Sequence, residues 1–152
     1  MQEPREGARR PREGFTLVEL LVVIAVIGIL AMLAIPQIRD ARVKGIRRQG
    51  MTTVEDLSLA LERHASEGNY TYTDGNGACP GSRTYQEGQI VPDVNLAIHD
   101  SYFQYTIRAS DPNGDGLCEA FQVIATGAAA PILGETITHD QVGVKGGTLG
   151  WQ

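Results

Sequence analysis

Residues 14–36 read GFTLVELLVVIAVIGILAMLAIP, and every residue from Leu20 to Ile35 is apolar or glycine. A helix that crosses the hydrocarbon core of a bilayer, which is about 30 Å thick, needs roughly 20 residues of this kind. No small-x-small cleavage site follows the apolar run, so a removable secretory signal peptide fits poorly. The stretch therefore predicts a membrane-spanning helix that the mature protein keeps.

One carboxylate, Glu19, interrupts this apolar stretch. An acidic residue at the centre of a membrane helix costs about 3 kcal/mol on insertion scales, so such residues usually have a partner and a function. The alternative is that the Glu19 side chain extends to the lipid headgroups and pairs with no specific group. We favour the interpretation in which Glu19 has a partner.

The sequence GFTLVE at residues 14–19, followed by the apolar run, resembles the processing site and N-terminal helix of bacterial type IV prepilins. Pseudopilins of type II secretion share this signature, and the detailed resemblance covers residues 14–36. It implies that a prepilin peptidase cleaves between Gly14 and Phe15 on the cytoplasmic side. It also implies methylation of the Phe15 amine and assembly into a helical filament. Glu19 of one subunit would then neutralise the Phe15 amine of a neighbour, because opposite charges attract strongly where the dielectric constant is low.

The chain divides into a leader, the two halves of a long helix, a loop region and a sheet. We assign the cleaved cytoplasmic leader to 1–14, the transmembrane half of the helix to 15–36 and its amphipathic half to 37–68. The loop region is 69–97, and the antiparallel sheet with the C-terminal segment is 98–152. Arginines lie on both sides of the apolar run, so charge alone leaves the membrane orientation open. The processing motif implies a cytoplasmic leader and a periplasmic C-terminal domain.

The second half of the helix is predicted from apolar or small residues at steps of three and four. These residues are Val43, Ile46, Gly50, Val54, Leu57 and Leu61. Gly68-Asn69 is a typical helix end, so we predict one helix from Phe15 to Glu67. Gly28 and Pro36 each weaken helix continuity. The resemblance implies that the section between them loses helix when subunits assemble.

The remainder of the chain predicts a small antiparallel sheet. Residues 69–97 are rich in Gly, Pro, Asn and Asp, which is typical of a loop region. Residues 101–109 and 119–126 alternate apolar and polar side chains and predict a β-hairpin. We expect a third strand within 135–139 and a fourth within 141–144. A long helix with a small antiparallel sheet is an α+β fold.

The turn between the hairpin strands has the spacing of the first half of a calcium loop. Its oxygen ligands would come from Asp111, Asn113, Asp115, the backbone carbonyl of Leu117, and Glu119. Position 12 of the loop is Gln122 rather than the usual bidentate glutamate, so only a weak calcium site is predicted. Turns rich in Asp, Asn and Gly also form without any metal, and no cofactor is required.

The chain has two cysteines, and the export that the resemblance implies predicts a Cys79–Cys118 disulfide. The alternative is a pair of free buried thiols. After removal of residues 1–14, nine basic and fifteen acidic residues remain. This acidic balance argues against direct nucleic-acid binding by the single subunit.

Catalysis has no support, because no H-E-x-x-H, G-x-S-x-G or phosphate-loop motif is present. We therefore predict a structural subunit that forms a homo-oligomeric type IV pilus for adhesion, motility or DNA uptake. The subunit would reside in the inner membrane, meet the peptidase and the pilus assembly machinery, and end in an extracellular filament. The first alternative is a type II secretion pseudopilin, although the Asp-Pro-Trp-Gly segment common in its major form is missing. The second is a monomeric membrane-anchored domain, which would need neither the Gly14-Phe15 junction nor Glu19.

Overall fold

The computed structural model describes residues 14–69, 71–149 and 151, so the predicted leader lies outside the described residues except for Gly14. The chain forms two compact units, Met1–Asp40 and Ala41–Gln152. Helix α1, Leu17–His64, is continuous and contributes to both units, and the π-helical turn η1, Ala65–Asn69, follows it. The predicted single helix is confirmed, with its end displaced by only a few residues.

In the first unit, α1 exposes apolar side chains on all sides. The exposed fractions of its large hydrophobic residues run from 49% at Val23 to 81% at Leu17. The helix passes Gly28 and Pro36 without interruption, although Pro36 has no N–H to offer to the carbonyl of Met32. A helix that is apolar all round is stable only inside a membrane or against other helices. Within the described part of the chain, one helix is long and apolar enough to span a bilayer.

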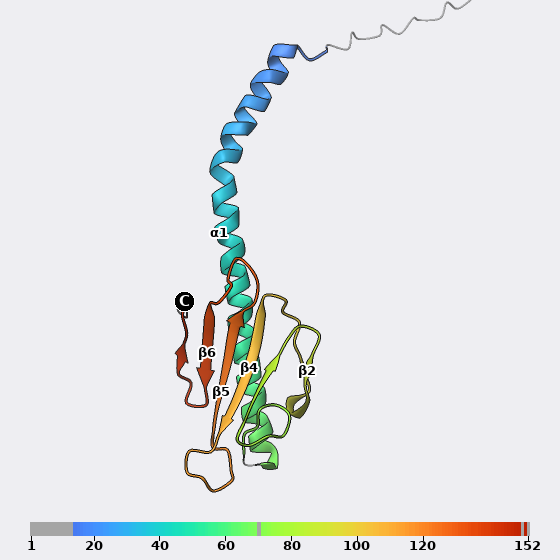
Figure 1. Ribbon diagram of the computed structural model, residues 1–152. Helices are drawn as coiled ribbons and strands as arrows, with labels where there is room; N and C mark the ends of the chain where they lie inside the picture. The colour runs from blue at the N-terminus through green and yellow to red at the C-terminus, as the bar shows by residue number, and fades with distance from the viewer. Residues whose placement is uncertain (1–13, 70, 150, 152) are drawn as a thin grey trace, which may run out of the picture. The chain divides into compact units, whose positions relative to one another are not determined.

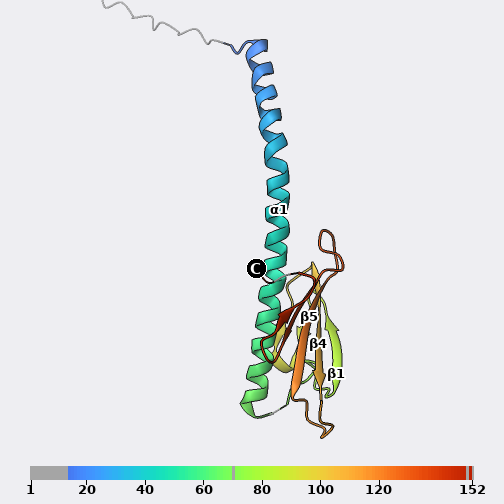
Figure 2. The ribbon, with the colours of Figure 1, turned by 90° about the vertical axis from the view of Figure 1, so that its left-hand side faces the viewer.

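The second unit packs the C-terminal half of α1 against a five-stranded antiparallel sheet (Figures 1 and 2). The strand order is β1-β4-β5-β6-β7, and β2 and β3 form a separate two-stranded sheet. The strands are β1 Gly81–Tyr85, β2 Ile90–Val91, β3 Leu96–Ala97, β4 Phe103–Ser110, β5 Ala120–Gly127, β6 Thr136–Asp140 and β7 Lys145–Gly146. A 3-10 turn, η2 (Pro92–Val94), separates β2 from β3.

The core lies between α1 and the inner face of the sheet. The predicted helical stripe is confirmed: Val43 is partly buried and the other five residues are buried. The predicted alternation in the hairpin is also confirmed, since every second residue of β4 and β5 is buried. Gly50 permits a close approach of α1 to β4, because a Cβ atom there would lie 2.5 Å from Cε2 of Phe103.

Residues 69–97, predicted as a loop region with little regular structure, contain the strand β1 of the main sheet as well as the short β2, η2 and β3. Strand β1 pairs with β4 from Gly81↔Ala109 to Tyr85↔Tyr105 and forms one edge of the sheet. Its sequence GSRTY buries only Tyr85 fully, so no apolar alternation reveals the strand. Backbone pairing with β4, rather than a local sequence pattern, determines its conformation.

The predicted fourth strand at residues 141–144 is wrong, because this segment forms a turn. Oδ1 of Asp140 accepts hydrogen bonds from the backbone nitrogens of Val142 (3.0 Å) and Val144 (2.9 Å). Gly143 adopts a φ of +81°, which the turn requires and a strand does not tolerate. The last strand is therefore the two-residue β7, which pairs with β6 after the turn.

Candidate functional site

The start of α1 is capped by Thr16, a role that the sequence interpretation missed. The Glu19 backbone N–H donates to the Thr16 hydroxyl oxygen at 3.2 Å, and the Leu20 N–H donates to the Thr16 carbonyl at 3.2 Å. The spacing Thr-x-x-Glu is that of a capping box and was the available signal. The cap fixes Glu19 in the first helical turn, where the helix dipole favours a negative charge.

The predicted processing and assembly residues lie on an open surface of the first unit. Gly14, Phe15 and Glu19 are exposed, with Phe15 at 80%. A Cβ atom on Gly14 or Gly28 would meet no other heavy atom within 4 Å. Packing within the subunit therefore does not require glycine at either position. The roles of these residues and of Pro36 in processing and assembly stay predictions.

The predicted Cys79–Cys118 disulfide is present in the second unit, with a Cα–Cα distance of 5.6 Å. Two hydrogen bonds accompany it: the Cys118 N–H donates to the Thr71 hydroxyl at 2.8 Å, and the Tyr72 N–H donates to the Cys118 carbonyl at 2.8 Å. These bonds join the segment after α1 to the segment before β5. The region after the helix is thereby fastened to the sheet.

The β4–β5 turn is held by its own acidic side chains. The Asp111 carboxylate accepts hydrogen bonds from the N–H groups of Gly114 (2.6 Å) and Gly116 (2.8 Å). The hydrogen bond from Gly116 is the main cause that lowers the pKa of Asp111, because it stabilises the ionised carboxylate. The carboxylate of Asp115 accepts from the Leu117 N–H at 2.8 Å.

Three of the proposed calcium ligands, Asp111, Asn113 and Asp115, are therefore engaged in the turn itself. Asn113 accepts a hydrogen bond from the Asp115 N–H at 3.3 Å, and its amide donates to the Asp115 carboxylate at 3.2 Å. Across residues 14–69, 71–149 and 151, no three His, Cys, Asp or Glu side chains gather as a metal-binding group. Asp111, Asp115 and Glu119 are thus not brought together, and calcium binding by this turn stays a prediction.

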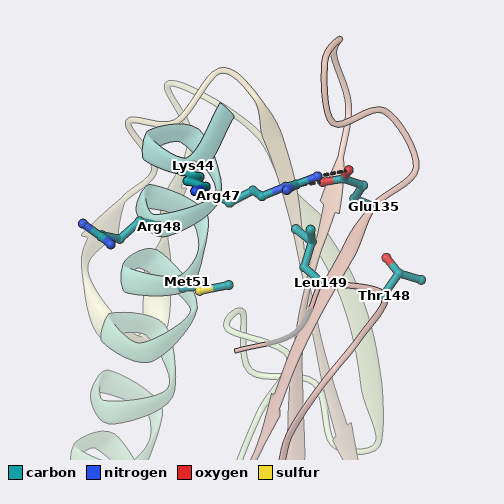
Figure 3. A pocket seen from close by; sticks show the side chains of 7 residues that line it. All are labelled: Lys44, Arg47, Arg48, Met51, Glu135, Thr148 and Leu149. Atoms are coloured by element: carbon teal, nitrogen blue, oxygen red, sulfur yellow. Dashed lines mark hydrogen bonds and ion pairs between the residues drawn. The ribbon is translucent and has the colours of Figure 1, made fainter. Parts of the chain in front are cut away.

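A basic cleft of about 630 Å³ lies between α1 and the C-terminal part of the second unit (Figure 3). It is lined by Lys44, Arg47, Arg48, Met51, Glu135, Thr148 and Leu149. Arg47 reaches across to Glu135, with Nε···Oε2 at 3.1 Å and Nη2···Oε1 at 2.7 Å. The hydrogen bond to Glu135 raises the pKa of Arg47. Lys44 and Arg48 are exposed, and Arg48 extends away from the Arg47–Glu135 pair in Figure 3.

Comparison with known proteins places this arrangement among fimbrial subunits. The family profile for the prokaryotic N-terminal methylation motif matches residues 9–35. The type IV major fimbrial protein FimA of Dichelobacter nodosus is 30% identical over 128 residues, covering 84% of this chain and 76% of FimA. A fimbrial protein of Pseudomonas aeruginosa is 30% identical over 129 residues, covering 85% of this chain and 79% of that protein.

A minor fimbrial protein of Dichelobacter nodosus is also similar, with 29% identity over 96 residues and 60% of each chain covered. No solved structure shows a significant match. The similarity to the fimbrial proteins extends well beyond the apolar helix, through most of the second unit. The chain therefore belongs to the type IV fimbrial protein (pilin) family, whose members are structural filament subunits and not enzymes.

Proposed function

We propose that the chain is a type IV pilus subunit that is inserted in the inner membrane, cleaved after Gly14, N-methylated at Phe15 and polymerised through α1. A prepilin peptidase performs the cleavage, and the pilus assembly machinery extracts the subunit from the membrane. Before assembly the unit 41–152 lies in the periplasm. In the filament the same unit forms the outer surface, where it supports adhesion, motility or DNA uptake.

The observation that carries this proposal is the pattern of exposure in the first unit. Large apolar side chains from Leu17 to Ile38 are exposed around the whole helix. Each fully buried Leu, Ile or Val side chain contributes roughly 1.5–3 kcal/mol relative to an exposed one. A membrane covers these side chains before assembly, and a bundle of identical helices covers them in a filament. Polymerisation therefore preserves apolar burial while the subunit leaves the bilayer.

Glu19 is the charged group within this apolar surface. After cleavage the Phe15 amine is also charged, and in a helix bundle both charges are costly unless they are paired. A neighbour's amine beside Glu19 removes both costs at once and fixes how far one helix slides along the next. The fimbrial names of the relatives support a pilus over the secretion pseudopilus.

The experiment is an intact-mass measurement on subunits sheared from the cell surface. We expect wild-type protein to begin at Phe15 with one added methyl group. Gly14→Val is expected to stay in the membrane fraction with the mass of the leader-bearing chain, because a side chain obstructs the close approach of the peptidase to this bond. Gly45→Ala serves as the control, since a Cβ atom at Gly45 meets no heavy atom within 4 Å. A mature N-terminus elsewhere, or the absence of sheared filaments from wild-type cells, would refute the proposal.

A further inference from the structure

The basic cleft is lined by two cations, Lys44 and Arg48, that form no ion pair within the described part of the chain. Lys44 and Arg48 lie one turn apart on the same face of α1, where like charges repel. Within residues 14–69, 71–149 and 151 neither side chain forms an ion pair, whereas the neighbouring Arg47 is held by Glu135. Met51 and Leu149 also line the cleft. The cleft therefore suits a ligand that combines negative charge with an apolar group.

The β4–β5 turn of the same chain, residues 111–119, has this composition, and we call it the acidic turn. Leu117 is 49% exposed although it is large and apolar, and Asp115 and Glu119 are exposed beside it. Cys118 is fully buried between Leu117 and Glu119. In an extended segment alternate residues point the same way, so Leu117 and Glu119 both face outward.

The acidic turn is also rigidly held, which lowers the entropic cost of binding. Asp111 fixes its tip through two backbone hydrogen bonds, and the Cys79–Cys118 disulfide fastens its base. Glu119 makes no hydrogen bond or ion pair within the described residues, so its carboxylate is available to a docked cation.

The two surfaces lie at opposite ends of the second unit. In Figures 1 and 2 the acidic turn lies beside the C-terminal end of α1, while the cleft is formed by residues 44–51 near the start of this unit. The contacts of Thr71 and Tyr72 with Cys118 agree with this placement. A contact between the two surfaces must therefore join two molecules. Because the surfaces differ, the contact is head-to-tail, and repeating it without closure builds an open helical polymer.

We propose that the acidic turn of one copy docks into the basic cleft of the next copy in the filament. Asp115 and Glu119 then face the cations of the cleft, and Leu117 enters toward its apolar lining. This inference rests on the proposed function, since it names a second subunit contact beyond the helix bundle. An anionic lipid headgroup also suits the cations, but it does not account for an exposed leucine between two carboxylates at the other end of the unit.

The test is reciprocal charge reversal in the full-length subunit, read as the ratio of sheared filament to membrane-bound subunit. Like charges across an interface cost several kcal/mol, so Lys44→Glu/Arg48→Glu is expected to lower the ratio about tenfold or more. Asp115→Lys/Glu119→Lys is expected to lower it similarly. The four substitutions combined in one chain restore opposite charges and are expected to recover most of the filament.

The matched control is Arg63→Glu/Arg108→Glu, which changes the net charge equally at two exposed arginines outside the cleft. We expect it to leave the ratio near the wild-type value. Membrane-bound protein with an intact Cys79–Cys118 disulfide shows that each variant folds. Normal filaments from either reversed variant, or no recovery in the combined variant, would overturn the docking. A loss confined to the cleft variant would indicate a different occupant, such as a lipid, and would overturn it too. Wild-type cells without filaments would instead refute the proposed function.

Discussion

Arg47 and Glu135 form a two-point ion pair that joins α1 to the segment just before β6. The two N···O distances are 3.1 and 2.7 Å, and the side chains are 37% and 25% exposed. A fork-shaped guanidinium on a carboxylate fixes direction as well as distance. The pair therefore holds helix and sheet in one orientation at the edge of the basic cleft.

We expect Arg47→Met to lower the free energy of unfolding by about 1 kcal/mol, since part-exposed ion pairs are worth about that or less. A double-mutant cycle with Glu135→Gln, measured by thermal unfolding of the full-length protein in detergent, isolates the coupling. The coupling should shrink at high salt, because counter-ions screen exposed charges. Two single-variant effects that simply add would show that the pair contributes no stability.

Gly50 and Gly45 lie on the same helix and are expected to respond oppositely to alanine. At Gly50 a Cβ atom would lie 2.5 Å from the Phe103 ring, whereas at Gly45 it would meet nothing within 4 Å. Gly50→Ala should therefore destabilise the protein by about 1–3 kcal/mol through overpacking. Gly45→Ala should stabilise it by about 0.5–1 kcal/mol through helix propensity. Equal effects of the two substitutions in denaturant titrations would contradict the described packing of α1 on β4.

The stability of the second unit is expected to fall at alkaline pH. Burial raises the pKa of Tyr85 to about 12, and its hydroxyl donates to the Asp74 carbonyl at 3.0 Å. Burial first, and then the 2.7 Å hydrogen bond to Asp100, raises the pKa of Tyr105. Because the pKa of each tyrosine is higher in the folded than in the unfolded state, its contribution to the free energy of unfolding is fully present below the unfolded pKa of about 10. This contribution is lost as the pH rises above that value.

The measurement for this prediction is the free energy of unfolding as a function of pH, with and without Tyr85→Phe. Phenylalanine does not ionise, so the variant should lose less stability than wild type between about pH 10 and 12. Identical slopes for the two proteins in this range would show that Tyr85 ionises equally in the folded and unfolded states.

The acidic turn gives a prediction about metals. Asp111 holds the turn through the Gly114 and Gly116 N–H groups, so chelators are expected to leave the melting temperature unchanged. If the predicted calcium site forms, its affinity should be weak, in the range of about 10⁻⁴ to 10⁻³ M. Millimolar calcium should then raise the melting temperature of wild type but not of Asp115→Asn. An equal change in the melting temperature of both proteins would show that calcium does not bind at this turn.

How far the sequence predicted the fold depends on which physical force formed each element. The stripe from Val43 to Leu61 and the hairpin β4–β5 follow apolar periodicity, and burial confirms both. Strand β1 has almost no apolar alternation, and its pairing with β4 comes from backbone hydrogen bonds between distant residues. The short β7 was misplaced because Asp140 caps a turn that local sequence patterns do not distinguish from a strand end.

The candidate sites also differ in whether a local sequence pattern or the tertiary fold forms them. The Cys79–Cys118 pairing was predictable because the chain has only two cysteines. The Thr16 cap was readable from the Thr-x-x-Glu spacing. The basic cleft was not predictable, because Glu135 and Leu149 reach α1 only through the tertiary fold.

The proposed assembly mechanism depends on the pairing of Glu19 with the Phe15 amine of a neighbouring subunit. Glu19→Gln keeps the shape of the side chain and removes its charge. The variant should insert in the membrane, because a neutral amide costs less in hydrocarbon than a carboxylate. It should also be cleaved, because the Gly14-Phe15 bond is unchanged. The matched control, Glu55→Gln, instead removes a half-exposed carboxylate of the second unit, which pairs with Lys145 there.

The decisive measurement is the amount of mature subunit in sheared filaments relative to the membrane fraction for wild type, Glu19→Gln and Glu55→Gln. We expect wild type and Glu55→Gln to form filaments. Glu19→Gln should accumulate as cleaved subunit in the membrane, because an incoming subunit finds no counter-charge for its amine. Abundant normal filaments from Glu19→Gln would contradict the pairing of Glu19 with the Phe15 amine.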